Sequence, residues 1–437
     1  MWKLNFLLLS QLLTAHGGTI SPSLLSKVQN GNKSDAILEL PSIFENVMSN
    51  PALSLLSGMA KVNMMTTLFK EATSVSQAPF LSAISGLGIS STPFWISNDI
   101  AMKDVDLNAV QSLAALPGVF TLREPVKVRM SKINDVNRFA RQSGTQWGVT
   151  KIQAPSVWSR SKGAGSVVAS IDTGAYKEHE SIRDNYGGKW YDPIYGKTAP
   201  DDRQGHGTHT IGTMVGRSNG IGVAPDAKWI ACRGLDNSGS GSESWLKSCG
   251  QWVLQQRPTV CCNSWGGGGG QTFYNDVVKS WRAAGIIPVF ANGNAGSDCR
   301  TAGSPGDQPN LISVGSTDSD DQMSYFSSRG PSPTGAIKPE ISAPGGNIVS
   351  AGISSPTSYT SKSGTSMATP HVVGAIALMK AVNPGWTYDN VLSALSKTAD
   401  RPNVSSNDLG CGRNTSSNYP NNAYGFGRIN VKKALGM

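Results

Sequence analysis

The stretch SKSGTSMATPHVVGAIALMK, residues 361–380, combines a polar start with a long run of small and apolar residues. The run predicts a buried helix, and Ser366 stands directly before it. A serine at this position has two interpretations. It can cap the helix by accepting hydrogen bonds from the free N–H groups of the first turn. It can instead be a nucleophile, because a helix start offers N–H donors and a positive dipole end that stabilise a developing oxyanion.

Length and composition describe a turn-rich globular protein with room for more than one domain. The chain has 437 residues, with 49 glycines, 24 prolines and 15% charged residues. Its net charge is +9, but the lysines and arginines are scattered and form no basic run. A basic balance of this kind does not by itself indicate nucleic acid, so we expect no nucleic-acid partner.

The N-terminus predicts a signal peptide over residues 1–17. One lysine is followed by an apolar run from Leu4 to Leu13 and then by small residues, including Ala15 and Gly17. The run is too short to span a bilayer, and no later segment reaches that length. We therefore expect a secreted, extracellular protein with no membrane span.

Secretion would permit disulfides, and six cysteines allow 15 full pairings, among which the sequence does not choose. Two neighbouring cysteines would point to opposite faces of a strand, so they are not expected to pair with each other. Sequons at Asn403 and Asn414 suit a secreted glycoprotein. The cysteines are Cys232, Cys249, Cys261, Cys262, Cys299 and Cys411.

The first part of the chain, residues 41–130, predicts a compact α+β module. A polar and basic segment, residues 131–148, follows it and has the character of a linker, in which Arg138 and Arg141 frame a cleavage point. An independent protein-binding domain is the alternative interpretation of the module. The module's expected helices are residues 51–72 and 107–116, and its expected strands are residues 92–105 and 118–130.

After Trp147 the pattern changes to short apolar, β-branched runs that alternate with helical stretches and glycine-containing turns. Continuous apolar strands that end in loops predict a parallel sheet covered on both faces. The strand candidates are residues 166–174, 227–235, 259–267, 285–294 and 310–318, and the helix candidates between them are residues 242–256 and 272–285.

Two strand-end loops carry residues suited to catalysis, since functional groups collect at the carboxyl ends of parallel strands. Asp172 ends an apolar strand, although taken alone it could form an Asx turn. His206 lies between two glycines at the start of a small-residue helix. A zinc site with His209 is not expected, because the spacing is i,i+3 and the Glu of the H-E-x-x-H pattern is missing. We interpret His209 as structural.

Asp172, His206 and Ser366 follow one another in the order Asp, His, Ser, one of the orders known for a single catalytic geometry. Their motifs, "DTG", "GHGTHT" and "GTSMATPH", resemble those of the subtilisin-like serine proteases, or subtilases. The stretches "KWYDPIYG", "GVAPDAKWIA", "NSWGG" and "YPNNAYGFGRIN" are most similar to the bacillopeptidase-F-like branch. The resemblance covers residues 147–434. A non-catalytic relative would lack a triad member, and none is missing.

The resemblance implies a three-layer α/β/α domain with a seven-stranded parallel sheet, preceded by a small ferredoxin-like α+β propeptide. The implied protein is a serine endopeptidase, made as a self-processing zymogen. Its expected parts are a signal peptide over residues 1–17, a propeptide with linker over residues 18–141 and a catalytic domain over residues 142–437.

The resemblance also assigns roles to residues. Asp172, His206 and Ser366 would be the catalytic triad, and Asn294, which follows the glycine in "FANGNAG", would hold the oxyanion. Asn292 departs from the family, where alanine is common, and is expected to line the specificity pocket. Two walls would pair with an extended substrate: Ser264, Trp265 and Gly266 form one, and Ala291, Asn292 and Gly293 form the other.

The implied partners are protein or peptide substrates bound as an extended strand, and the chain's own propeptide as an intramolecular inhibitor. We expect the enzyme to act as a monomer. The chemistry requires no cofactor. The family often binds structural calcium, but no acidic run here has a readable ligand spacing, so no metal ligand is assigned.

Overall fold

The computed structural model describes residues 17–130, 134–139, 144–412 and 418–437. The chain divides into two compact units, Met1–Pro125 and Val126–Met437. The expected signal peptide, apart from Gly17, lies outside the described residues, and so do Arg141 and the sequon at Asn414.

The first unit contains a five-stranded sheet in the order β1-β5-β2-β4-β3. From β2 onward its elements follow the order β-α-β-β-α-β, and the antiparallel strand order β5-β2-β4-β3 is that of a ferredoxin-like fold. The expected fold of this unit is confirmed. Its elements are β1 (Thr19–Ile20), α1 (Pro22–Gln29), β2 (Ser34–Glu39), α2 (Phe44–Met48), η1 (Pro51–Leu55), α3 (Gly58–Gly86), β3 (Ser91–Phe94), β4 (Asp99–Val105), α4 (Leu107–Ala114) and β5 (Thr121–Arg123).

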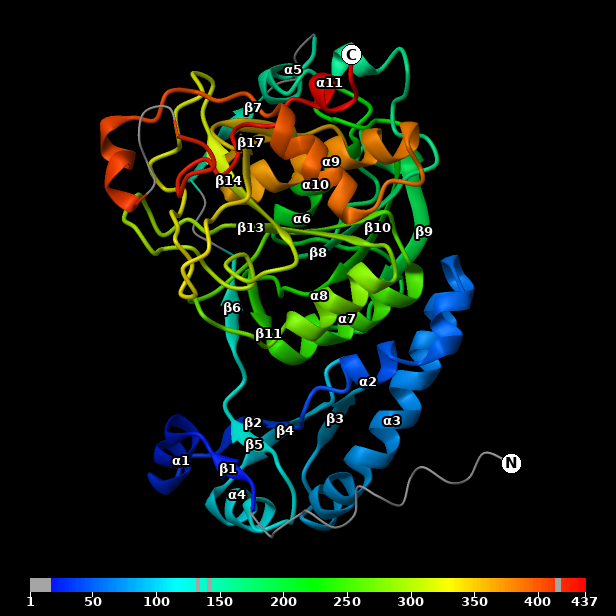
Figure 1. Cartoon of the computed structure of the whole chain (residues 1–437), viewed down its shortest axis with the longest axis vertical. Helices are drawn as coiled ribbons and strands as arrows, with labels where there is room; N and C mark the ends of the chain where they lie inside the picture. Colours follow the sequence, from blue (N-terminus) through cyan, green and yellow to red (C-terminus); the bar gives the residue numbers. More distant parts are fainter. Residues whose placement is uncertain (1–16, 131–133, 140–143, 413–417) are drawn as a thin grey trace. The chain divides into compact units, whose positions relative to one another are not determined.

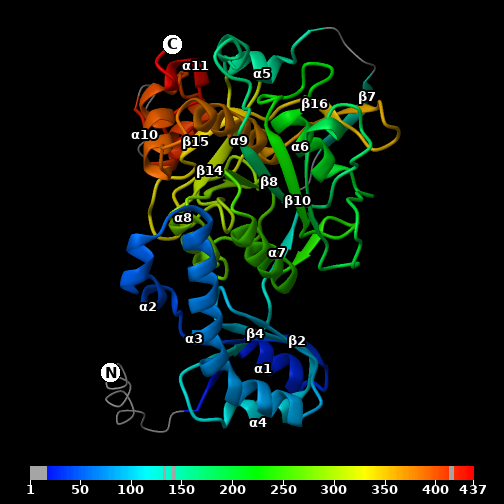
Figure 2. The same cartoon turned by 90° about the vertical axis from the view of Figure 1, so that its right-hand side faces the viewer.

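Helices α1, α3 and α4 share one apolar core with the sheet, to which Leu24, Leu38, Ile84 and Leu113 contribute (Figure 2). Neither α1 nor β2 was predicted from the sequence. The strand expected over residues 118–130 was wrong as a single element. It divides into β5 and β6 around the Glu124-Pro125 pair, and proline cannot donate to a central ladder.

The second unit is built on a seven-stranded sheet in the order β15-β14-β13-β12-β8-β10-β9, in which every pair is parallel. All five strands predicted from apolar runs are present, and the expected fold class is confirmed. The strands are β8 (Val167–Asp172), β9 (Tyr186–Tyr191), β10 (Lys228–Arg233), β12 (Val260–Asn263), β13 (Ile287–Ala291), β14 (Ile312–Thr317) and β15 (Ile341–Pro344).

Helices cover both faces of this sheet and make three layers (Figure 1). One face carries α6 (His206–Val215), α9 (Thr365–Val382) and α10 (Tyr388–Thr398), and the other carries α7 (Glu243–Gln256) and α8 (Asn275–Ala283). Helix α9 is buried from its first residue to Met379 and packs against β12, β13, β14 and β15. The apolar run that opened the sequence analysis is therefore the central helix of the domain.

Smaller elements surround these layers. Strand β6 pairs with β11, and β7 pairs with β17 at the edge of a three-stranded sheet. None of the described helices is long and apolar enough to cross a membrane. The remaining elements are β6 (Lys127–Arg129), β7 (Asn134–Phe139), α5 (Trp147–Lys151), η2 (Pro155–Val157), η3 (Arg183–Asn185), β11 (Ser240–Ser242), β16 (Ile348–Ala351), β17 (Tyr359–Ser363), η4 (Ser406–Cys411) and α11 (Val431–Ala434).

Two disulfides cross-link the second unit, Cys232–Cys249 and Cys299–Cys411. The adjacent Cys261 and Cys262 in β12 are free and buried, as expected for neighbours on opposite faces of a strand. Burial raises the pKa of the Cys261 thiol well above its usual value, so this cysteine stays protonated and unreactive.

Candidate active site

The candidate residues come together because the sheet is parallel. Asp172 is the last residue of β8, Ser264 follows β12, and Asn294 follows β13, so all three lie at the same edge of the sheet. Helix α6 begins at His206, and α9 begins one residue before Ser366. These two helices pack against each other over the same face of the sheet.

Asp172 and His206 form a buried, charge-assisted pair. The Nδ1–H of His206 donates to Oδ1 of Asp172 over 2.7 Å, and both side chains are almost completely buried. The backbone N–H of Thr173 donates to the same oxygen over 2.7 Å. In the described part of the chain, Nε2 of His206 has no hydrogen-bond partner. The carboxylate thus fixes the tautomer that leaves Nε2 free to accept a proton.

A second buried carboxylate, Asp202, connects the loops that carry this pair. Its Oδ1 accepts from the hydroxyl of Thr173 over 3.0 Å and from the N–H of Gly205 over 2.8 Å. Its Oδ2 accepts from the N–H and the hydroxyl of Thr208 over 3.0 and 2.7 Å. The sequence analysis did not identify Asp202, although an aspartate shortly before the predicted helix start at His206 was an available signal.

Ser366 does not cap helix α9. The N-cap position is Gly364, which has no side chain with which to cap the helix. The Ser366 hydroxyl instead donates to the backbone carbonyl of Ser264 over 3.0 Å, and the Ser264 hydroxyl donates to the carbonyl of Ser366 over 3.0 Å. The capping interpretation is wrong, and the hydroxyl lies beside the loop that follows β12.

Two N–H groups lie near each other at the start of α9. Oδ1 of Asn294 accepts from the N–H and the hydroxyl of Thr365 over 2.9 and 2.7 Å, so its Nδ2 is not used in this contact. Nδ2 is buried and has no partner among the described residues. A methyl group added at Gly364 would lie 3.1 Å from Nδ2 of Asn294 and 3.6 Å from the backbone N of Ser366. Both donors therefore border one small space.

The side chain of Asn292 does not line the pocket, and this corrects the expectation from the sequence. It is completely buried, its Nδ2 donates to the carbonyl of Ser328 over 2.7 Å, and its Oδ1 accepts from the hydroxyl of Ser313 over 2.8 Å. Its backbone N–H and carbonyl are also used, by Val314 and Gly303. Asn292 is a bracing residue behind the pocket wall, because all of its polar groups are satisfied inside the protein.

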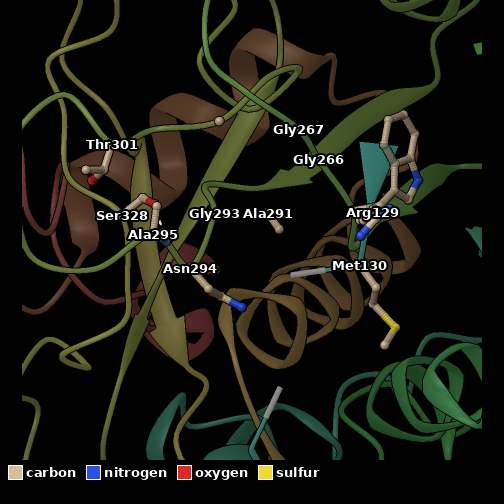
Figure 3. A pocket seen from close by; sticks show the side chains of 12 residues that line it. Arg129, Met130, Gly266, Gly267, Ala291, Gly293, Asn294, Ala295, Thr301 and Ser328 are labelled. Atoms are coloured by element: carbon tan, nitrogen blue, oxygen red, sulfur yellow. Dashed lines mark hydrogen bonds between the residues drawn. The ribbon is translucent and has the colours of Figure 1, made fainter. Parts of the chain in front are cut away.

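A pocket of about 290 Å³ opens beside the two donors. Figure 3 shows Asn294 projecting its amide nitrogen toward the centre of the view, with Gly293 and Ala291 on one side and Met130 on the other. The remaining wall includes Trp265, whose ring is buried and packs edge-on against Phe290 at 5.5 Å between ring centroids. The lining residues are Arg129, Met130, Trp265, Gly266, Gly267, Ala291, Gly293, Asn294, Ala295, Thr301, Gly303 and Ser328.

An extended strand reaches the mouth of this pocket. Strand β6 pairs antiparallel with β11, and Arg129 also donates its N–H to the carbonyl of Gly266 over 3.1 Å. The N–H of Met130 donates to the carbonyl of Gly239 over 2.8 Å. Of the residues expected to pair with an extended substrate, Gly266 contacts this strand, and β11, which was not predicted, pairs with it as well. Ala291 and Gly293 line the pocket instead of pairing with β6.

Glycines in the β11 segment were the signal that could have found this wall. A methyl group added at Gly241 would lie 2.7 Å from a methyl group of Val128, and one added at Gly239 would lie 3.1 Å from the Cβ of Met130. Only a residue without a side chain lets β6 come this close.

Among the described residues, no group of three or more His, Cys, Asp or Glu side chains could hold a metal ion. His209 is completely buried, and its Nε2 lies 3.0 and 3.1 Å from the carbonyls of Ile348 and Thr360. Burial lowers the pKa of His209 well below its usual value of 6.5, so the ring is neutral. The structural interpretation of His209 is confirmed.

Comparison with known proteins gives a consistent result. The model of the subtilase family matches residues 163–427. Bacillopeptidase F of Bacillus subtilis (strain 168) is 39% identical over 328 residues, which cover 67% of this chain but only 22% of that protein. Thermitase of Thermoactinomyces vulgaris is 36% identical over 264 residues, 59% of this chain and 90% of that protein. A subtilisin of Bacillus pumilus is 36% identical over 295 residues, 66% of this chain and 98% of that protein.

A buried Asp–His pair, a serine in the first turn of a helix and two neighbouring N–H groups thus lie at one edge of a parallel α/β sheet, an arrangement compatible with serine-hydrolase chemistry. With the match over residues 163–427, the chain belongs to the subtilase family of serine endopeptidases.

Proposed function

We propose that this chain is a secreted serine endopeptidase that hydrolyses peptide bonds through Asp172, His206 and Ser366. The observation that carries the proposal is the pairing of Nδ1 of His206 with Asp172, which leaves a buried, unpartnered Nε2 among the described residues. A serine hydroxyl is a weak nucleophile until a base removes its proton, and neutral histidine suits that task near neutral pH.

In the proposed reaction the Ser366 hydroxyl leaves the carbonyl of Ser264, gives its proton to His206 and attacks the scissile carbonyl. The Nδ2–H of Asn294 and the backbone N–H of Ser366 then hold the oxyanion, since both border the same space. His206 returns the proton to the leaving amine, and Asp172 stays ionised throughout. Water completes the cycle by hydrolysing the acyl-enzyme.

We further propose that the protein is a zymogen in which residues 18–141 form the propeptide and residues 142–437 the mature enzyme. The support is local to the second unit, where β6 occupies the groove between β11 and Gly266 as a substrate strand would. Two disulfides in this unit fit an oxidising, extracellular compartment. The substrates, the monomeric state and any glycosylation at the exposed Asn403 belong to the same proposal.

Replacement of Ser366 by alanine tests the proposal. The Ser366→Ala chain should have no peptidase activity and should accumulate as an uncleaved precursor, because hydrolysis and self-processing use the same nucleophile. The variant is expressed in a host without other secreted proteases; a peptide-hydrolysis assay measures its activity, and an intact mass shows whether the precursor is cleaved. Normal processing of the purified variant would remove Ser366 from the nucleophile role.

A further inference from the structure

The groove between β11 and Gly266, in which β6 lies, offers one hydrogen-bond acceptor that belongs to a side chain and not to the backbone of a strand. Strand β11 ends at Ser242, because the chain enters helix α7 at Glu243 and the next backbone groups point along the helix. Beside β6, the hydrogen-bond ladder continues with a side chain. The N–H of Val126 donates to Oε2 of Glu243 over 2.9 Å, directly after the pairing of Ser242 with Lys127 (Figure 1 shows β6, β11 and α7).

The carboxylate of Glu243 is held in place. Its Oε1 accepts from Nζ of Lys247, one helical turn on, over 2.7 Å, and the two side chains are 0% and 1% exposed. A buried ion pair is costly to desolvate and persists where further hydrogen bonds use its remaining acceptors. The N–H of Val126 is such a bond, and a charged acceptor makes it stronger than a neutral pair.

We infer that Glu243 is a substrate-binding residue. It extends backbone recognition to the substrate residue that takes the place of Val126, four residues before the one whose N–H donates to Gly239. This rests on the proposed function, with β6 standing for the substrate strand. Any polypeptide bound in the register of β6 places an N–H against Oε2 of Glu243. A residue without that N–H, such as proline, loses this charge-assisted hydrogen bond. Glu243 thus favours substrates that extend to this position and disfavours proline there.

The test uses synthetic peptides with the sequence of residues 124–137 and the active, processed enzyme. In one peptide the amide N–H of Val126 is replaced by an ester oxygen, which removes the donor without adding bulk. In a second peptide the same replacement is made at Met130, whose N–H donates to Gly239 instead. We expect the ester at Val126 to lower kcat/KM about tenfold, as for the loss of a hydrogen bond to a charged group.

The variant Glu243→Gln completes a double-mutant cycle, because glutamine keeps the shape of the side chain and loses its charge. The fall in kcat/KM caused by the ester at Val126 should be severalfold smaller in this variant. The fall caused by the ester at Met130 should be the same in both enzymes. Equal rates for the Val126 ester and amide in the unaltered enzyme would overturn the inference, whether or not the variant folds. An enzyme that cleaves none of the peptides and no protein would instead reject the proposed function.

Discussion

Residues far away in the sequence hold Ser366 in position. The carbonyl of Ser264 accepts a hydrogen bond from the Ser366 hydroxyl. Oδ1 of Asn294 accepts one from the N–H of Thr365, the first residue of α9. Helix α9 therefore begins beside the ends of β12 and β13, and backbone and amide groups of the loops that follow these strands hold Ser366 in place. Single substitutions around it should accordingly separate catalytic from structural roles.

Asn294 should act mainly on the transition state. Asn294→Ala and Asn294→Asp both remove the Nδ2–H donor, and the aspartate keeps an acceptor for Thr365. We expect both to lower kcat by about 10²–10³-fold with little change in KM, a magnitude known for an oxyanion donor in a subtilisin and not calculated from this structure.

Asn292→Ala is the comparison variant, measured by steady-state kinetics and thermal unfolding. Because its amide braces Ser328 and Ser313 from inside the protein, we expect a lower melting temperature and no altered preference for the substrate side chain. A large fall in kcat for Asn292→Ala, with normal turnover for both Asn294 variants, would transfer the oxyanion role to Asn292.

Asp202 is expected to position the Asp172–His206 pair. Asp202→Asn replaces one acceptor by an amide group that cannot serve both donors of Thr208, so the loops should shift and kcat should fall roughly 10- to 100-fold. Asp226→Asn is the matched control, because Asp226 forms only a half-exposed pair with Arg217, worth about 0–1 kcal/mol. Unchanged kcat in Asp202→Asn would show that Asp202 is not needed for positioning.

Among the individual residues, the sequence predicted those that stand in short motifs. Asp172, His206 and Ser366 stand in local patterns that depend on neighbouring residues alone. Asp202, Asn292 and Glu243 were missed or misinterpreted, because their roles depend on which way a side chain points once distant segments meet. Asn292 in particular looked available beside a pocket, but the fold turns its amide toward Ser328 and Ser313.

Among the elements, the strands of the large sheet were the easiest to predict. Their continuous apolar runs reflect burial on both faces, and this signal is local. Strands β6 and β11 lack it, since each has three residues, of which only the middle one is buried. The two strands can pair because glycines in the β11 segment let β6 come close and because the chain leads β6 past them. The spacing of apolar residues in the sequence shows neither feature.

The register of β6 leads to a prediction for the processing bond. Arg129 lies opposite Gly266 in an antiparallel bridge, so a strand continued by two residues brings residue 131 opposite Ser264. The carbonyl of Ser264 accepts the Ser366 hydroxyl. We therefore expect the first cleavage after Ser131, which lies outside the described residues, and a later cleavage in the linker at the proposed boundary between residues 141 and 142.

N-terminal sequencing of the earliest processed product identifies which bond is cleaved first. The sequence should begin at Lys132, and the product should be absent from the Ser366→Ala chain. A first product that begins at residue 142, formed by the purified enzyme alone, would show that the bond is not set by the register of β6.

The whole molecule consists of two units that differ in size. The first, Met1–Pro125, is the smaller and has one small apolar core, although its strands β2 and β5 also pair across a long stretch of sequence, for example Leu38 beside Leu122. The second closes a parallel sheet whose neighbouring strands β8 and β12 are about 90 residues apart, for example Val168 beside Val260. Sheets built from such distant pairs fold slowly, because loop-closure entropy is lost before the contacts form.

We therefore predict that the first unit assists the folding of the second and inhibits it afterwards. Residues 142–437 refolded alone should give little active enzyme, and addition of residues 18–141 as a separate chain should raise the yield and then slow peptide hydrolysis. The measurement is recovered activity as a function of added segment. Equal yields with and without the segment, together with no inhibition, would reject the propeptide role.

The most direct test of the central claim, a nucleophile at Ser366 activated by His206, is covalent labelling with a fluorophosphonate, followed by peptide mass mapping. We expect one adduct per chain, on the peptide that contains Ser366, formed in step with the loss of peptidase activity. We also expect no adduct in Ser366→Ala and a greatly slowed reaction in His206→Ala. An inactivated enzyme whose adduct lies on another residue, or full activity with Ser366 labelled, would contradict the claim.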